Sequence, residues 1–190
     1  MSGIAAVLVM ALAGGAYVYG DQPAVADRVN GLVAAVSETF AGSDRYGDWL
    51  VRCIEREGLP PCDIVQSLTD NDTQEVLMQF SVAYSPDQDL YAVQIRVPLG
   101  YIVSAGTVIR IDGEADITSY VTSRCEVEGC FIESLVTGAD LAPFEAGSQG
   151  AVVLLAQNGQ PFGLPFSLDG FSAALQDMVA RNRGAARNRG

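Results

Sequence analysis

Short runs rich in valine, isoleucine and aromatic residues recur along the chain from residue 49 onward, with turn-forming residues between them. Apolar and polar residues tend to alternate within the runs, as in strands that bury one face of an antiparallel sheet. The pattern therefore predicts an all-β dominated fold, an antiparallel β-sandwich, rather than alternating strands and helices. The runs are WLVRCI (49–54), EVLMQFSVAY (75–84), LYAVQIRVPL (90–99), TVIRI (107–111), ITSYV (117–121), CFIESLV (130–136), AVVLLAQ (151–157) and FGLPFSL (162–168).

Two dipeptides predict tight hairpin turns between these runs. Asn158-Gly159 is the stronger signal, because a two-residue hairpin turn of this type needs positive φ at both positions. Asp112-Gly113, directly after the run at 107–111, is the second.

One helix is predicted near the C-terminus, in DGFSAALQDMVARN (169–182), where Ser167 or Asp169 is placed to cap its start. Its apolar face is expected to pack on the sandwich, with Phe171 and Leu175 as core anchors. Trp49, the single tryptophan, is predicted to be a third core anchor rather than a ligand platform. The helical face consists of Phe171, Ala174, Leu175 and Met178.

The N-terminal segment, residues 1–20, is almost uncharged from Gly3 to Gly20, and its apolar run spans roughly 25 Å as a helix, just about a bilayer core if the helix ends adapt. It predicts a transmembrane or signal helix, either a cleaved signal peptide or an anchor in the inner membrane through residues 3–20. The lack of a basic residue near the start and the two tyrosines near its end favour the anchor. The predicted anchor residues are Ile4, Val7, Leu8, Val9, Met10, Leu12, Tyr17 and Tyr19.

The rest of the chain divides into three predicted parts. Residues 21–45 are expected to form a linker that is partly helical, and residues 46–180 the globular domain. Residues 181–190, which contain RNRG twice, are expected to be a flexible Arg-rich tail.

The four cysteines form two local pairs, Cys53 with Cys62 and Cys125 with Cys130. Neither pair has the two-residue spacing of redox-active dithiols, and the first spacing is too long for a four-cysteine zinc site. Behind an export segment the surroundings are oxidising, so the pairs predict structural disulfides. Three connectivities are open, and the two local closures are the simplest.

Composition excludes several classes of function. The chain carries 23 acidic and 11 basic residues, a net charge of −12, so we expect no nucleic-acid binding by the body. It has no histidine, and every basic residue is an arginine, which removes the usual general base and the lysine that could replace it. We therefore expect no enzymatic activity, no cofactor and no metal.

Acidic residues cluster in three segments that resemble turns. Alternating carboxylates suit Ca²⁺, but none of these segments has a twelve-residue loop with a distant bidentate glutamate. A turn-forming role is therefore the favoured interpretation. The acidic residues are Asp70, Asp72, Asp87, Asp89, Asp112, Glu114 and Asp116.

A set of short motifs occurs in a specific order along the domain. They are Gly47-Asp48-Trp49, Cys53, Pro61-Cys62, Gln66, Pro98-Leu99-Gly100, Asp112-Gly113, Cys125, Gly129-Cys130, Ser167-Leu168 and Gly170-Phe171. With these motifs the chain resembles the invasion-associated locus B family of bacterial exported proteins over about residues 46–180. The resemblance implies an exported, disulfide-containing β-sandwich domain, linked in some pathogens to host-cell invasion, and supplies no catalytic residues.

These features together predict a non-enzymatic, membrane-anchored periplasmic protein. We expect it to act by protein–protein contacts, as an accessory or stabilising subunit of a membrane complex or on an envelope protein. The alternative is a secreted or surface-located virulence factor that binds a host or envelope target. The sequence leaves the oligomeric state open.

Overall fold

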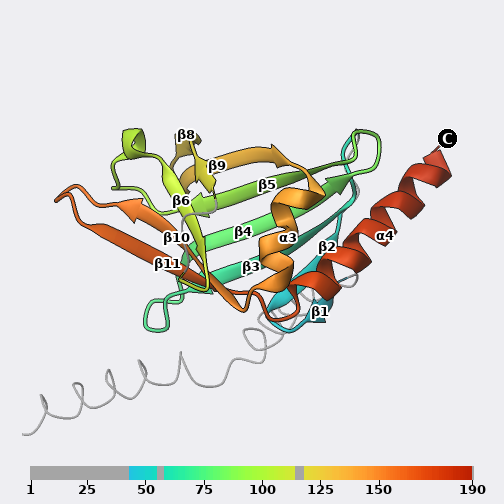
Figure 1. The fold of residues 1–190 in the computed structure, drawn as a ribbon, viewed down its shortest axis with the longest axis horizontal. Helices are drawn as coiled ribbons and strands as arrows, with labels where there is room; N and C mark the ends of the chain where they lie inside the picture. Colours follow the sequence, from blue (N-terminus) through green and yellow to red (C-terminus); the bar gives the residue numbers. More distant parts are fainter. Residues whose placement is uncertain (1–42, 55–57, 114–117, 190) are drawn as a thin grey trace, which may run out of the picture. The chain divides into compact units, whose positions relative to one another are not determined.

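The computed structural model describes residues 43–54, 58–113 and 118–189 (Figure 1). The predicted membrane segment and the predicted linker helix lie outside the described residues. Within the described part of the chain, no helix combines the length and apolar character needed to cross a membrane.

A seven-stranded antiparallel sheet forms most of the domain (Figure 1). Its strand order is β1-β2-β3-β4-β5-β9-β8. The first five strands are neighbours in sequence order, and β9 and β8 then extend the sheet beyond β5. The strands are β1 (Asp44–Tyr46), β2 (Trp49–Cys53), β3 (Cys62–Thr69), β4 (Val76–Ser85), β5 (Leu90–Val97), β9 (Gly129–Val136) and β8 (Thr122–Glu126).

A second antiparallel sheet has four strands in the order β11-β10-β6-β7. Among the described residues two helices complete the fold, and Figure 1 shows α3 and α4 beside the part of the large sheet that the small sheet leaves uncovered. The elements are β6 (Thr107–Ile111), β7 (Thr118–Tyr120), β10 (Gln149–Leu155), β11 (Pro161–Ser167), the 3-10 turn η1 (Val103–Ala105), α3 (Gly138–Ala146) and α4 (Phe171–Arg189).

The two sheets and the helices share one hydrophobic core, as a sandwich requires. Trp49 contacts Phe80 and Phe171 edge to face, with ring centroids 5.7 and 5.0 Å apart. Phe80 contacts Phe166 of the small sheet at 5.1 Å, so this aromatic cluster joins both layers. Trp49, Phe171 and Leu175 are all buried, as predicted for core anchors.

The motifs near both ends of the domain form a polar latch between the sheets. Gln66 of β3 accepts a hydrogen bond from Ser167 N (2.8 Å) and donates one to Ser167 O (3.0 Å). The Trp49 indole donates to the same carbonyl at 2.9 Å. Gly170 has φ of 81° and lies so close to the backbone of Tyr46 that a Cβ would clash. These residues therefore have structural roles.

The two hairpin predictions are confirmed in part. Asp112 and Gly113 both have positive φ (52° and 75°), as the turn type requires. Asn158-Gly159 does connect β10 to β11, but only Gly159 of the two is left-handed. Asn158 instead accepts a hydrogen bond from Gln160 N (3.0 Å), which stabilises a longer loop.

Several elements differ from the sequence prediction. Four of them, β1, β3, β8 and α3, were not predicted. β1 and β8 are short and mostly polar, β3 has polar residues among its apolar ones, and α3 contains Pro143 and buries only two side chains, Leu141 and Phe144. The helix begins where the Asp140 carboxylate accepts hydrogen bonds from Thr137 N (2.8 Å) and Thr137 Oγ1 (2.7 Å).

The predicted flexible tail is a further difference, and this prediction was wrong. α4 continues without interruption to Arg189, so residues 181–189 are helical. The reason is a set of contacts that hold this end of α4 on β3 and β1. The first two residues of the predicted tail, Arg181 and Asn182, make those contacts.

Candidate functional site

The outer face of the large sheet, the face turned away from the core, has a row of side chains that crosses five strands. Alternation along each strand places them on the same face. The row consists of Arg52, Asp63, Ala83, Ala92 and Leu135, from β2 across to β9. Because Ala83 and Ala92 have small side chains, the sheet surface is recessed at these two positions. It is raised where the larger side chains of Arg52 and Leu135 stand at the ends of the row.

This shape creates a hollow of about 450 Å³, which we call the sheet hollow. Its floor includes Ser81, Ala83 and Ala92, and Leu135 stands at one side with its surface 60% exposed. Leu59, 54% exposed, stands on the side formed by the loop before β3. Exposed aliphatic side chains around a floor of small residues suit the insertion of a partner's apolar side chain.

The Cys53–Cys62 disulfide fixes the loop that carries Leu59. The two cysteines stand directly opposite each other on β2 and β3, with Cα atoms 4.0 Å apart. Beyond them, Ile54 N donates to Pro61 O at 2.8 Å, which continues the ladder by one more pair. The disulfide therefore holds Leu59, Pro60 and Pro61 at the rim of the hollow.

A bidentate ion pair forms one end of the hollow. Arg52 donates from Nε and Nη2 to the two carboxylate oxygens of Asp63, both at 2.8 Å. The hydrogen bond to Asp63 raises the pKa of the Arg52 guanidinium. The two charges cancel, so this end of the hollow is polar but neutral.

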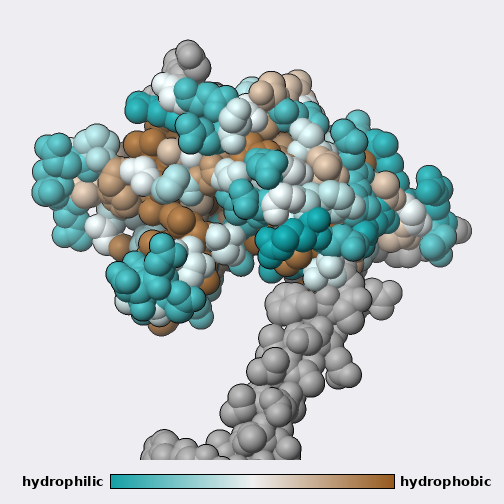
Figure 2. Space-filling view, turned by 90° about the horizontal axis from the view of Figure 1, so that it is seen from below, coloured by the Kyte–Doolittle hydropathy of each residue, from teal (hydrophilic) through white to brown (hydrophobic). Residues whose placement is uncertain are grey.

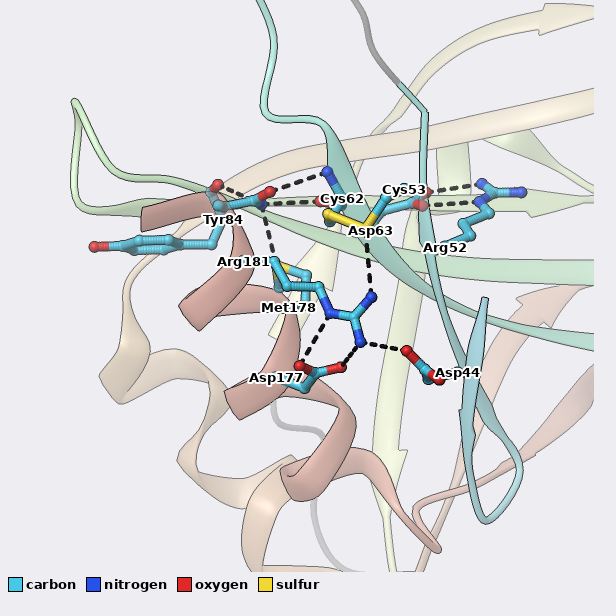
Figure 3. Close-up of a disulfide and its surroundings, with 10 residues drawn as sticks. Asp44, Arg52, Cys53, Cys62, Asp63, Tyr84, Asp177, Met178 and Arg181 are labelled. Carbon is cyan, nitrogen blue, oxygen red and sulfur yellow. Dashed lines mark hydrogen bonds and ion pairs between the residues drawn. A yellow bond between two sulfur atoms is a disulfide. The ribbon is translucent and has the colours of Figure 1, made fainter. Parts of the chain in front are cut away.

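Helix α4 clamps the opposite face of the same disulfide (Figure 3). Asn182 is fully buried; its Nδ2 donates to Cys62 O (2.9 Å) and Tyr84 O (3.0 Å), and its Oδ1 accepts from Cys62 N (2.9 Å). One amide thus satisfies three backbone groups on two strands that would otherwise be buried without partners. This contact therefore supports the start of β3, which lines the hollow.

Arg181 adds a second contact beside the disulfide (Figure 3). Its guanidinium lies between the carboxylates of Asp177 and Asp44, and its Nη1 lies 3.9 Å from Cys53 Sγ. The hydrogen bonds to Asp177 and Asp44, in that order, raise the pKa of Arg181. The ion pair with Asp44 connects the middle of α4 to β1, the first strand of the domain.

The second predicted disulfide, Cys125–Cys130, also forms, and it lies at the far edge of the large sheet. It joins directly opposed residues of β8 and β9, with Cα atoms 3.9 Å apart. Cys125 is exposed, and Val127 at the hairpin tip is 92% exposed. Arg124 beside it pairs with Glu126 and Glu133 and lies over the Phe131 ring at 4.3 Å.

The acidic segments of the sequence act as turns where the structure describes them. The Asp70 carboxylate accepts from Thr73 N (2.8 Å) and Asp72 N (2.9 Å), which lowers the pKa of Asp70. Asp112 accepts from Ser148 N (3.1 Å) and Gln149 N (3.0 Å). Residues 114–117 lie outside the description. Among the residues that are described, no three His, Cys, Asp or Glu side chains are grouped to hold a metal ion.

Sequence analysis missed the sheet hollow and the Asn182 clamp. The hollow depends on which residues of β3, β4 and β5 stand opposite one another, and the run pattern did not include β3. Asn182 falls in the Arg-rich segment, whose polar composition is typical of a solvated end. The only signal for it was that the helical spacing of Phe171, Ala174, Leu175 and Met178 reaches residue 182.

The fold and the site define a disulfide-stabilised β-sandwich domain with a hollow on an outer sheet face. Residues 49–179 match the family model of the invasion associated locus B (IalB) protein. The match covers most of the chain, so the chain belongs to the IalB family. No curated protein matches it.

A crystal structure of invasion associated protein B from Bartonella henselae has the same fold. The two chains are 25% identical, with a TM-score of 0.67. The similarity covers 75% of this chain and 97% of the Bartonella chain.

Proposed function

We propose that this chain is a non-enzymatic, membrane-anchored protein whose domain faces the periplasm. It acts through protein–protein contacts, as an accessory or stabilising subunit of a membrane complex. The sheet hollow is the contact surface, and the observation that carries the proposal is the exposed pair of Leu59 and Leu135 on either side of a floor of small residues.

Two of the sheet edges, β11 and β8, carry features that oppose strand addition and so favour a face contact. β11 is an edge strand of the small sheet, and it has proline at positions 161 and 165, neither of which can donate a hydrogen bond. β8, an edge of the large sheet, is five residues long and has a register shift between Thr122 and Arg124. The prolines of β11 and the short, irregular β8 both protect an edge from pairing with another strand.

Charge indicates the chemistry of the partner segment. The chain has a net charge of −12, and Asp87 and Glu133 lie next in sequence or register to residues that line the hollow. In the view of Figure 2, hydrophilic residues cover most of the surface, and the apolar ones gather in the half that holds β10 and β11. The hollow therefore suits a partner segment with an apolar side chain between basic residues.

Affinity capture of the full-length protein from detergent-solubilised membranes tests the proposal. The wild type is expected to bring down a fixed set of membrane proteins. Ala92→Arg fills the floor of the hollow and adds an unpaired charge, so at least about tenfold less partner should be recovered. Ala173→Arg, a substitution at an exposed position of α4, is the matched control and should capture the wild-type amount.

Two outcomes would contradict the proposal. One is recovery of the wild type as a free monomer with no co-purifying membrane protein. The other is undiminished capture by Ala92→Arg in a folded protein.

A second candidate function follows from the similarity to the Bartonella protein, which is named invasion associated protein B. In this case the chain is cleaved, then secreted or displayed on the surface, and the hollow binds a host or envelope target. The intact mass of protein from native cells separates the two candidates, because a mature chain that begins near Asp27 supports secretion and a full-length chain supports the anchor.

A further inference from the structure

A second concave site lies on the other side of the large sheet, between α3, α4 and the start of β5. It has a volume of about 300 Å³, and we call it the helix cleft. Its floor is apolar: Leu141 and Leu175 are buried at its base, and Val179 and the Tyr91 ring line it above them. It shares no lining residue with the sheet hollow.

The two ends of the helix cleft carry opposite charges. Glu145 lies beside the first turn of α4, where its backbone carbonyl accepts a hydrogen bond from Ser172 Oγ (3.3 Å). Arg183, which also lines the cleft, is eleven residues beyond Ser172 on the same helix, about 16 Å along the axis. An apolar cleft with a carboxylate at one end and a guanidinium at the other matches an elongated, polarised ligand.

The Arg183 guanidinium is held in position by aromatic residues. It lies over the Tyr84 ring at 5.2 Å, and its Nη2 donates to Tyr84 Oη at 3.2 Å. Tyr84 Oη in turn donates to Asp89 Oδ1 at 2.7 Å. Among the described residues, this relay is the one side-chain hydrogen bond that Arg183 makes, and it uses one of the five guanidinium donors, so the guanidinium can also bind a carboxylate in a preorganised geometry.

Tyr91 supplies a hydroxyl donor in the same cleft. Burial raises the pKa of Tyr91, so the phenol stays protonated at neutral pH. Gln176, with both a donor and an acceptor, lines the cleft together with Glu145. These groups fit the N–H and C=O groups of a peptide backbone, which a simple fatty acid lacks.

We propose that the helix cleft binds the C-terminal end of an apolar peptide. The terminal carboxylate pairs with Arg183 and accepts from the Tyr91 hydroxyl. Aliphatic side chains of the last residues rest on Leu141, Leu175 and Val179, and the peptide N–H groups face Glu145. Recognition of a free chain end would let the domain bind one specific terminus in a partner, independently of the sheet hollow.

Isothermal titration calorimetry of the full-length protein in detergent, with acetyl-Ala-Leu-Leu as the probe, tests this assignment. The peptide acid should bind at least about tenfold more tightly than its C-terminal amide, because the amide cannot form the charge-assisted bonds. Arg183→Gln should lose most of the binding. Arg187→Gln, one helical turn further along α4 and outside the cleft, should bind like the wild type.

Several results would overturn the assignment. They are equal affinity for acid and amide, wild-type binding by Arg183→Gln, and the absence of saturable binding of the acid. Octanoate that binds as tightly as the peptide would show a site for aliphatic carboxylates instead. Ala92→Arg should leave peptide binding unchanged, so failure of the peptide assignment and failure of the sheet hollow are separate results.

Discussion

The two disulfides of this domain have nearly the same local geometry but very different surroundings. Each joins directly opposed residues of neighbouring antiparallel strands, with Cα atoms 4.0 Å apart for Cys53–Cys62 and 3.9 Å for Cys125–Cys130. The first lies between the sheet hollow on one face and the α4 clamp on the other. The second closes a hairpin at an edge, with Cys125 exposed.

The difference shows that the covalent bond alone does not determine what a disulfide contributes. Loop-closure entropy is similar for sequence separations of 9 and 5, about 2 to 3 kcal/mol in each case. The two disulfides differ in how many noncovalent contacts the strands that they join make with the rest of the domain. In the first case these contacts support the wall of the sheet hollow, whereas in the second they only complete an edge of the sheet.

Removal of each disulfide should give the largest contrast. Cys53→Ala with Cys62→Ala is expected to lower the free energy of unfolding by about 3 to 5 kcal/mol, because the clamp on Cys62 is weakened as well. Cys125→Ala with Cys130→Ala is expected to cost about 2 kcal/mol. Urea denaturation of the full-length protein in detergent measures both, and equal losses would contradict the comparison.

The Asn182 clamp can be broken without changing either disulfide. Asn182→Ala leaves three buried backbone groups of Cys62 and Tyr84 without their partner, so the free energy of unfolding should fall by about 2 to 4 kcal/mol. Asn188→Ala, at an exposed position of the same helix, is the matched control. A loss below about 0.5 kcal/mol for Asn182→Ala would show that the clamp does not support β3.

The ion pairs beside the two disulfides should differ by less. Arg181→Gln removes contacts to both Asp44 and Asp177 and is expected to cost about 1 kcal/mol at low salt. Arg124→Gln, beside the exposed disulfide, is expected to cost less, since its pairs are more open to solvent. The same denaturation assay at low and high salt checks both, and a larger loss for Arg124→Gln would reverse the expected order.

The smallest expected effect is on how the free energy of unfolding depends on pH. The hydrogen bond from Arg124 lowers the pKa of Glu133 below its usual value of 4.5. The Glu133 carboxylate therefore stabilises the fold above that value, and the contribution is lost as the pH falls through the lowered pKa. Because the side chain is 35% exposed, we expect at most a few tenths of a kcal/mol between the wild type and Glu133→Gln at pH 7, and a difference that shrinks as the pH is lowered below 4.5. A difference that grows on acidification would contradict this sign.

The sequence predicted the features that depend on local patterns. Alternation placed most strands, and the spacing of Phe171, Leu175 and Met178 placed the start of α4. The even cysteine count in two local pairs predicted disulfides, and the two local closures, the simplest of the three connectivities left open, are the bonds that form. In each case the signal lies within a short stretch of chain and reflects one period or one loop.

The candidate site could not be predicted because it depends on contacts between distant residues. Ala83 and Ala92 form a floor only because they stand opposite each other, and Leu135 becomes a wall only because β9 returns beside β5. Asn182 is separated by 120 residues from the strand that it clamps. Nothing in RNRG indicates that one of its polar side chains is fully buried.

Site-specific photocrosslinking in living cells tests the central claim most directly. A photoreactive amino acid at position 92, in the sheet hollow, should form one discrete crosslink to a protein partner, and the same group at position 173 should form none. A discrete crosslink from position 173 alone, or the absence of any crosslink from position 92, would contradict the claim that the hollow beside the first disulfide is the binding surface.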